Sequence, residues 1–294
     1  MVPSPCIRDC RMDESSGLCL GCARTRSEIA TWKDESDEER RRIWLELPAR
    51  RASLGLKTHR LAWTTDELRS FILSTLRPVG GTWVSGVYGA VAEFCICDDD
   101  DVAFGDTEPF VKASTPRGAI AFQLSGHVNA FSIGVTPNPA ASDVIVLAVL
   151  REQAASYASR GLACAAQDVE AIRPEDRQDV LYNFGLGSAA AGFGIRTADL
   201  DLMTSLDKLI GQTYSAFLPS IGADILRVSP TRVIRNSIGR IEVFTPIPLP
   251  GGRSPAGPHT HFLPEHLATG GDLPPNLQTP EAYVPCFIHY PAPR

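Results

Sequence analysis

The sequence lacks any apolar run long enough to cross a membrane. Its longest clean run, Val144 to Leu150, falls far short of the roughly 20 residues that a transmembrane helix needs. The first residues, MVPSPCIRDC, also lack the basic segment and apolar stretch of a secretory signal. We therefore expect a cytoplasmic protein without membrane contact, in a compartment where thiols stay reduced.

An excess of basic residues is missing too. The formal net charge is -6 and is unevenly spread: residues 1–60 carry twelve Lys/Arg against ten Asp/Glu, and the remainder carries sixteen against twenty-four. Domains that bind duplex nucleic acid are usually strongly basic. Nucleic acid is therefore not expected as a partner, whereas an unidentified protein or small molecule is.

Familiar catalytic motifs are also absent. The sequence contains no nucleophile elbow, no HExxH zinc-protease motif and no Walker phosphate-binding loop. Catalysis thus has no anchor in the sequence, and whether the protein is an enzyme stays open at this stage.

What the sequence does contain is a cluster of cysteines. Four of its eight cysteines, Cys6, Cys10, Cys19 and Cys22, form the pattern C-x3-C, eight residues, C-x2-C. Each pair can bend around one ion, and two pairs complete the tetrahedral thiolate set of a closed zinc site. An iron–sulfur centre is the alternative, because it also favours tetrahedral sulfur. A redox dithiol at Cys19 and Cys22, or four unrelated thiols, are minor alternatives.

The residues around these cysteines support a metal module. Gly17 and Gly21 permit the tight backbone turns that paired cysteines need around an ion. Residues 1–24 hold few apolar side chains, so we expect a bound metal to supply the folding energy of this segment.

The same segment resembles a known family. The run SPCIRDCRMDESSGLCLGCARTRSEIATWKDESDEERRRI is similar to a short bacterial domain of unknown function (DUF1289), described as a predicted iron–sulfur protein; the resemblance spans roughly residues 3–52. Beside the four cysteines, the matching positions are Asp13, Gly17, Gly21, Arg24, Thr25, Glu28, Ile29, Trp32, Glu39, Arg40 and Ile43. The resemblance implies four-cysteine metal binding at these positions and no known reaction.

Three helix starts are predicted from capping-box spacing. The pairs that carry it are Thr25 with Glu28, Ser36 with Glu39, and Thr64 with Glu67. Pro48 is expected to end or kink the second helix. Because a basic connector follows, we place the boundary near residue 60, with a cysteine-rich module at 1–60 and a second domain at 61–294.

The second domain is predicted to be α+β with a mostly antiparallel sheet. Valine-rich and aromatic stretches predict strands at Trp83–Ile96, Ala119–Leu124, Val128–Val135, Val144–Leu150 and Arg240–Phe244. Helices are predicted at Gln153–Arg160, Glu175–Tyr182 and Leu200–Phe217. The fold expected for the chain is therefore a small metal-tied helical module followed by a larger α+β domain.

A histidine-rich tail offers a second metal hypothesis. In GPHTHFLPEHL, His259 and His261 are two residues apart and point to one face if the segment is extended, with His266 five residues further on. A polar surface loop is the favoured interpretation, and a second metal or catalytic site is the alternative. This stretch, with AIRPEDRQDVLYNFGLG and IGRIEVFTPIPLP, makes roughly residues 64–294 similar to an uncharacterised bacterial domain, which implies no activity.

The sequence thus predicts a metal-binding protein of unknown biological role. A four-cysteine zinc module, or an iron–sulfur module, is attached to a domain that binds a ligand or a protein. The alternative is a metalloenzyme or redox enzyme that uses an iron–sulfur centre or a metal held by His259 and His261.

Overall fold

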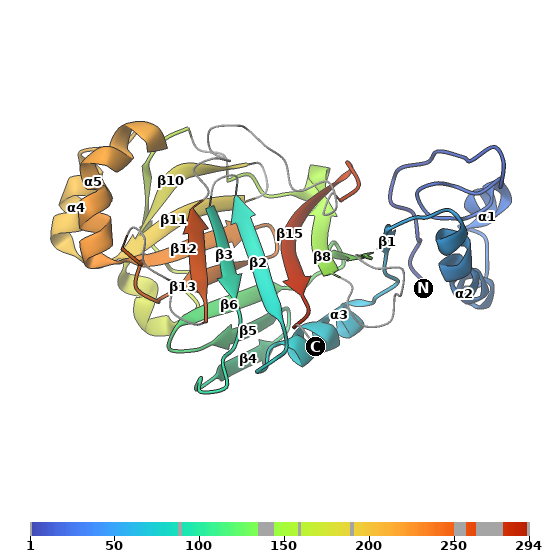
Figure 1. The fold of residues 1–294 in the computed structure, drawn as a ribbon, viewed down its shortest axis with the longest axis horizontal. Coiled ribbons are helices and arrows are strands. Elements are labelled where there is room, and N and C mark those ends of the chain that lie inside the picture. The colour runs from blue at the N-terminus through green and yellow to red at the C-terminus, as the bar shows by residue number, and fades with distance from the viewer. Residues whose placement is uncertain are drawn as a thin grey trace.

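The computed structural model describes residues 2–87, 90–134, 144–157, 160–188, 191–249, 257–262 and 279–292. In these ranges the chain forms two antiparallel β-sheets and a small helical module, which lies at one end of the sheets in Figure 1. The predicted α+β class, with mostly antiparallel strands, is confirmed.

The first sheet joins strands that are far apart in the sequence. Within the described residues its seven strands lie in the order β1 (Thr58–Arg60), β7 (Asn129–Ile133), β8 (Val144–Leu150), β15 (Tyr283–Tyr290), β2 (Thr82–Val87), β3 (Ala90–Phe94) and β14 (His259–Phe262). β15 pairs with β8 on one side and β2 on the other, so the end of the chain holds the two halves of this sheet together.

The second sheet is formed mainly by neighbouring strands. Its eight strands in the described ranges lie in the order β4 (Ala103–Thr107), β5 (Phe110–Ser114), β6 (Gly118–Gln123), β13 (Gly239–Val243), β12 (Thr231–Asn236), β11 (Ala191–Thr197), β10 (Val180–Ser188) and β9 (Ala163–Gln167). Its pairings are all antiparallel.

The two sheets pack face to face around one apolar core. Trp83 of β2 lies 4.9 Å from Phe122 of β6 and 6.3 Å from Phe287 of β15, measured between ring centroids. Since Phe122 belongs to the second sheet and Phe287 to the first, the Trp83 ring contacts both layers. Full burial of such a side chain contributes about 1.5–3 kcal/mol to folding.

Helices close the open parts of this sandwich. α3 (Thr65–Thr75) lies against one end, where Trp83 Nε1 donates a 2.9 Å hydrogen bond to Thr75 Oγ1. α4 (Leu200–Asp207) and α5 (Tyr214–Val228) lie at the far end from the module in Figure 1. Phe217 of α5 packs 5.2 Å from Phe184 of β10. No helix in the described part of the chain combines the length and apolar character that a bilayer span requires.

The module contributes two helices, α1 (Arg26–Thr31) and α2 (Asp37–Ser53). The predicted capping box of Thr25 and Glu28 is confirmed, as is that of Thr64 and Glu67 at the start of α3. At α2 half of the box forms: Ser36 accepts from the Glu39 amide, whereas the Glu39 carboxylate pairs with Arg42.

Two helix predictions were wrong, and the expectation that Pro48 ends or kinks the second helix fails in its first alternative. α2 continues five residues past Pro48 to Ser53, so the proline does not end it. Gln153–Arg160 contains only the end of a 3₁₀ turn, η1 (Arg151–Gln153), in its described residues. Glu175–Tyr182 splits into a second 3₁₀ turn, η2 (Pro174–Gln178), and the start of β10, because this segment lies along the sheet and pairs with it.

The predicted strand stretches are confirmed, but most of the second sheet was missed, because β4, β5, β9, β10, β11 and β12 lie outside those stretches. Strands occupy every stretch predicted to contain them, and Leu200–Phe217 holds α4 and the start of α5, with a break between them. The tail, which shows little periodicity, nonetheless supplies β14 and β15.

The module is joined to the sheets by more than its covalent connector. β1 pairs with β7 of the first sheet, and Ile7 from the cysteine segment is buried on the outer face of that sheet beside Phe131 and Tyr283. Arg8 forms a 3.1 Å ion pair with Glu152. The cysteine segment therefore rests on the first sheet, next to its β7–β8–β15 strands.

Candidate metal centre

The four module cysteines lie on two loops that face each other. Cys19 and Cys22 are buried, with 0% and 1% of their surface exposed; Cys6 is half-buried and Cys10 is exposed. Short antiparallel bridges hold the second loop, between Met12 and Cys19 and between Leu18 and Thr25.

Three of the four sulfurs accept a hydrogen bond from the residue two positions further on. The Arg8 amide donates to Cys6 Sγ at 3.3 Å and the Gly21 amide to Cys19 Sγ at 3.4 Å. Arg24 Nε donates to Cys22 Sγ at 3.5 Å. Thiols are weak acceptors, whereas hydrogen bonds to ionised acceptors are about twice as strong. The donors are thus placed where they stabilise thiolates, the form of cysteine that binds metal.

Gly21 sets the distance between the two loops. A Cβ atom at this position would lie 2.1 Å from the Asp9 carbonyl oxygen and 3.0 Å from Ile7 Cγ1. Gly21 is needed for this close approach, not for a turn, since its φ lies outside the left-handed region. Gly17 is the residue that needs a left-handed backbone, with φ +68° and open space around it.

The other three cysteines affect the ionisation of Cys10. Partial burial and the charges of Cys6, Cys19 and Cys22 raise the pKa of Cys10 to about 11. Even so, no three His, Cys, Asp or Glu side chains among the described residues already form a group able to hold a metal. The four side chains must draw closer together to enclose an ion.

Two buried arginines lie behind the cysteines. Arg24 and Arg51 are 2% and 6% exposed, and neither forms an ion pair with any described carboxylate. Arg24 stacks 4.7 Å from the Trp32 ring centroid and Arg51 5.3 Å from that of Trp44. Arg24 Nη1 and both Nε and Nη2 of Arg51 are buried without a hydrogen-bond partner. Burial lowers the pKa of Arg51 to about 10, while the charge of Cys22 acts to raise it.

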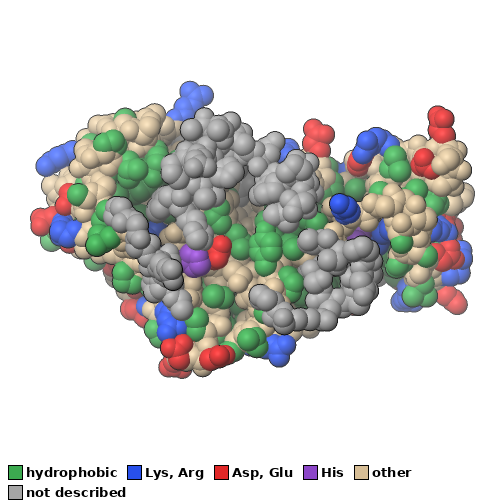
Figure 2. Space-filling model, viewed as in Figure 1, with side chains coloured by type: hydrophobic (Ala, Val, Ile, Leu, Met, Phe, Trp, Pro, Cys, Tyr) green, Lys and Arg blue, Asp and Glu red, His purple; other side chains and the backbone are tan. Residues whose placement is uncertain are grey.

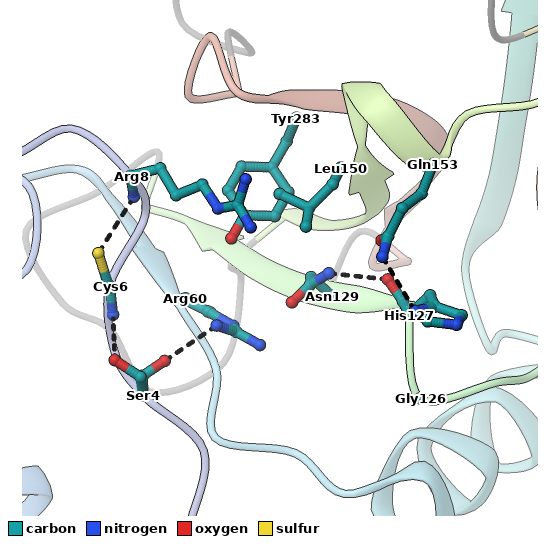
Figure 3. A pocket seen from close by; sticks show the side chains of 10 residues that line it. All are labelled: Ser4, Cys6, Arg8, Arg60, Gly126, His127, Asn129, Leu150, Gln153 and Tyr283. Atoms are coloured by element: carbon teal, nitrogen blue, oxygen red, sulfur yellow. Dashed lines mark hydrogen bonds between the residues drawn. The ribbon is translucent and has the colours of Figure 1, made fainter. Parts of the chain in front are cut away.

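A cavity of about 360 Å³ lies where the module meets the first sheet, and we call it the interdomain pocket. The module and connector supply part of its wall and the sheet supplies the rest; its lining consists of Ser4, Cys6, Arg8, Arg60, Gly126, His127, Asn129, Leu150, Gln153 and Tyr283. Figure 3 shows Arg8, Arg60, Asn129 and Tyr283 pointing toward the same hollow. One of the candidate metal ligands, Cys6, therefore borders a ligand-sized space.

The structure describes one of the three histidines of the second metal hypothesis in full. His259 lies on β14 opposite Glu93 of β3, and its Nε2 is 3.4 Å from Glu93 Oε2. Its Nδ1 is 2.9 Å from the Gly257 carbonyl oxygen. The side chain of His261 and the whole of His266 lie outside the described residues, so the grouping of the three histidines stays a prediction.

The arginines and the pocket were missed by the sequence reasoning. Arg24 is among the positions of the resemblance, but its burial against Trp32 depends on tertiary packing. The pocket residues come from separate segments of the chain, and no local spacing connects Arg60 to Tyr283.

Comparison with known proteins gives two families and no activity. The family described as "Family of unknown function (DUF6925)" matches residues 67–293, and that described as "Protein of unknown function (DUF1289)" matches residues 4–51. Neither a curated protein nor a solved structure matches the chain.

Proposed function

Since the chain belongs to the DUF6925 family of unknown function, we propose its role from the site alone: it is a metal-binding protein whose N-terminal module holds zinc through Cys6, Cys10, Cys19 and Cys22. The module sits on a β-sandwich that binds a ligand or a partner. The compartment proposed is the cytoplasm, where these thiols stay reduced.

The observation that carries this proposal is the pair of buried arginines without carboxylate partners. A buried guanidinium is costly unless a negative group compensates it. Four thiolates around a divalent ion keep a net charge of roughly −2, which the charges of Arg24 and Arg51 balance. Four neutral thiols would leave both arginines uncompensated. The charge of the surroundings therefore favours a thiolate centre.

Zinc is the first candidate because the donor set suits a closed site. Backbone and side-chain N–H groups on three sulfurs are compatible with four tetrahedral thiolates. An iron–sulfur cluster carried by the same four cysteines is the alternative, since it takes the same ligands.

A charge-balance experiment tests the proposal. The variant Arg24→Met keeps the length of the side chain over Trp32 and removes its charge. Charge-assisted hydrogen bonds contribute about 1.5–3 kcal/mol, so we expect zinc affinity to fall roughly ten- to hundredfold. Competition with a zinc chelator measures it.

The matched control is Arg41→Met, which removes the same charge from the exposed side of α2. Arg41→Met is expected to leave zinc affinity within about twofold of the native value. Equal zinc affinity in the Arg24 and Arg41 variants would contradict the charge-balance argument.

A metalloenzyme or redox enzyme is the second candidate, and the His259–Glu93 contact is what favours it. The Nδ1 position beside the Gly257 carbonyl lets His259 donate there and turns its Nε2 lone pair toward Glu93. This is the way metal-binding histidines are commonly oriented. Metal binding that is lost in His259→Ala and retained in a variant of the four module cysteines would support this candidate.

A further inference from the structure

The interdomain pocket carries positive charge in an acidic protein. Arg8 and Arg60 line it, no Asp or Glu stands among its described lining residues, and the chain as a whole has a net charge of -6. Figure 2 shows both basic and acidic side chains on the visible surface, whereas the described lining of the pocket includes arginines and no carboxylate. Such a wall attracts an anion.

Arg60 is the strongest candidate for an anchor. Its Nη1 donates to the Ser4 carbonyl oxygen at 3.0 Å, and it forms no ion pair with any carboxylate in the described part of the chain. Arg8, in contrast, is already paired with Glu152 at 3.1 Å. β1 fixes the backbone of Arg60 by pairing it with Phe131, so the free side of its guanidinium faces the pocket.

The Tyr283 hydroxyl is a second donor in the same space. The residue is 3% exposed, and its ring packs 4.9 Å from that of Phe131. Its hydroxyl makes no hydrogen bond to any described residue, although the ring is held in place. Burial raises the pKa of Tyr283, and the charges of Arg60 and Arg8 act to lower it; Figure 3 shows all three side chains extending toward the same hollow.

The opposite wall is polar and already ordered. Gln153 Nε2 lies 3.1 Å from His127 Nδ1, and because an amide nitrogen only donates, the ring hydrogen of a neutral His127 sits on Nε2. Asn129 Nδ2 donates to the His127 carbonyl oxygen at 2.8 Å. These polar groups bond to one another and fix that wall, and the pocket volume of about 360 Å³ is larger than a bare inorganic ion requires.

We propose that the interdomain pocket binds a small organic oxyanion, a carboxylate or a phosphate ester, with Arg60 and the Tyr283 hydroxyl holding the anionic group. This inference rests on the proposed function in one respect, because it names the ligand class of the larger domain. It does not require that the module holds zinc.

The test is isothermal titration of the full chain with succinate, with inorganic phosphate, and with neutral succinamide. Saturable binding of succinate or phosphate, without binding of succinamide, is expected, and the better of the two identifies the anionic group. Arg60→Gln is expected to weaken binding roughly ten- to hundredfold and Tyr283→Phe roughly fivefold. Arg77→Gln, which removes an exposed arginine beyond α3, is expected to leave affinity within about twofold.

Two results would overturn the inference: saturation by neither anion, or equal affinity in Arg60→Gln, Tyr283→Phe and the native protein. Far-ultraviolet circular dichroism and metal content are measured on each preparation. A variant that keeps its metal and its fold but loses the anion supports the pocket, whereas a native protein that is purified without any bound metal and still binds the anion refutes only the proposed module.

Discussion

Gly21→Ala tests whether the two cysteine loops must touch. The new Cβ would lie 2.1 Å from the Asp9 carbonyl oxygen, well inside contact distance, and the obstacle is backbone. Cys19 Sγ also lies 3.6 Å from this oxygen, so moving Asp9 away disturbs a cysteine contact as well. Relief therefore requires the loops to separate.

The magnitude follows from the cost of overpacking, which is about 1–3 kcal/mol and here belongs at the upper end. Without metal the loops can part and relieve the clash, whereas the metal-bound module cannot. We therefore expect zinc affinity to fall by about 3 kcal/mol, or roughly a hundredfold. Chelator competition with a colorimetric zinc indicator measures the change.

Gly17→Ala is the matched control within the same segment. Its Cβ would meet nothing within 4 Å, and only the left-handed backbone at φ +68° resists the change, at a cost of about 1–2 kcal/mol. Gly21→Ala should thus weaken zinc binding more than Gly17→Ala. Native affinity in Gly21→Ala would refute the view that this close approach builds the site.

Three further predictions concern the docking of the module on the first sheet, the charge of Asp168, and the coupling between the metal centre and the interdomain pocket. Ile7→Ala removes a side chain buried beside Tyr283 and should weaken docking by about 2–4 kcal/mol, seen as faster proteolysis near residue 60 with unchanged zinc content. Burial raises the pKa of Asp168, but Arg240 and Arg196 together hold it below its usual value, so its stabilising effect is present above about pH 4 and is lost as pH falls through the lowered pKa. Asp168→Asn should lower the unfolding free energy by about 3 kcal/mol at neutral pH. In urea titrations, the unfolding free energy of the variant should also fall less steeply than that of the native protein as the pH is lowered. An equally steep fall in the variant would contradict this. Zinc removal should weaken succinate or phosphate binding severalfold, because a candidate zinc ligand borders the pocket, and calorimetry on chelator-treated protein with unchanged affinity would separate the two sites.

Local signals account for what the sequence predicted well. The Thr25–Glu28 and Thr64–Glu67 boxes form because each needs only one helical turn. Val144–Leu150 is β8 to the residue, as a short, fully apolar run bounded by polar segments indicates.

The misses come from contacts between distant segments. Glu175–Tyr182 has helical character locally, but Asp176 is held by Arg196 of β11 at 2.6 Å, which fixes this stretch along the second sheet. The burial of Arg51 Nε and Nη2 without a hydrogen-bond partner in the described part of the chain, and the side of Arg60 that faces the pocket, likewise depend on which surfaces pack together. No residue spacing in the sequence predicts these contacts between distant segments.

The central claim is that Cys6, Cys10, Cys19 and Cys22 hold one metal centre. Metal analysis with an optical spectrum, on protein purified without oxygen, tests it most directly. About one zinc per chain and no visible absorbance is the predicted result, and iron with labile sulfide and a brown colour would place a cluster on the same ligands. Neither metal, with four freely titratable thiols in residues 1–24, would contradict the account.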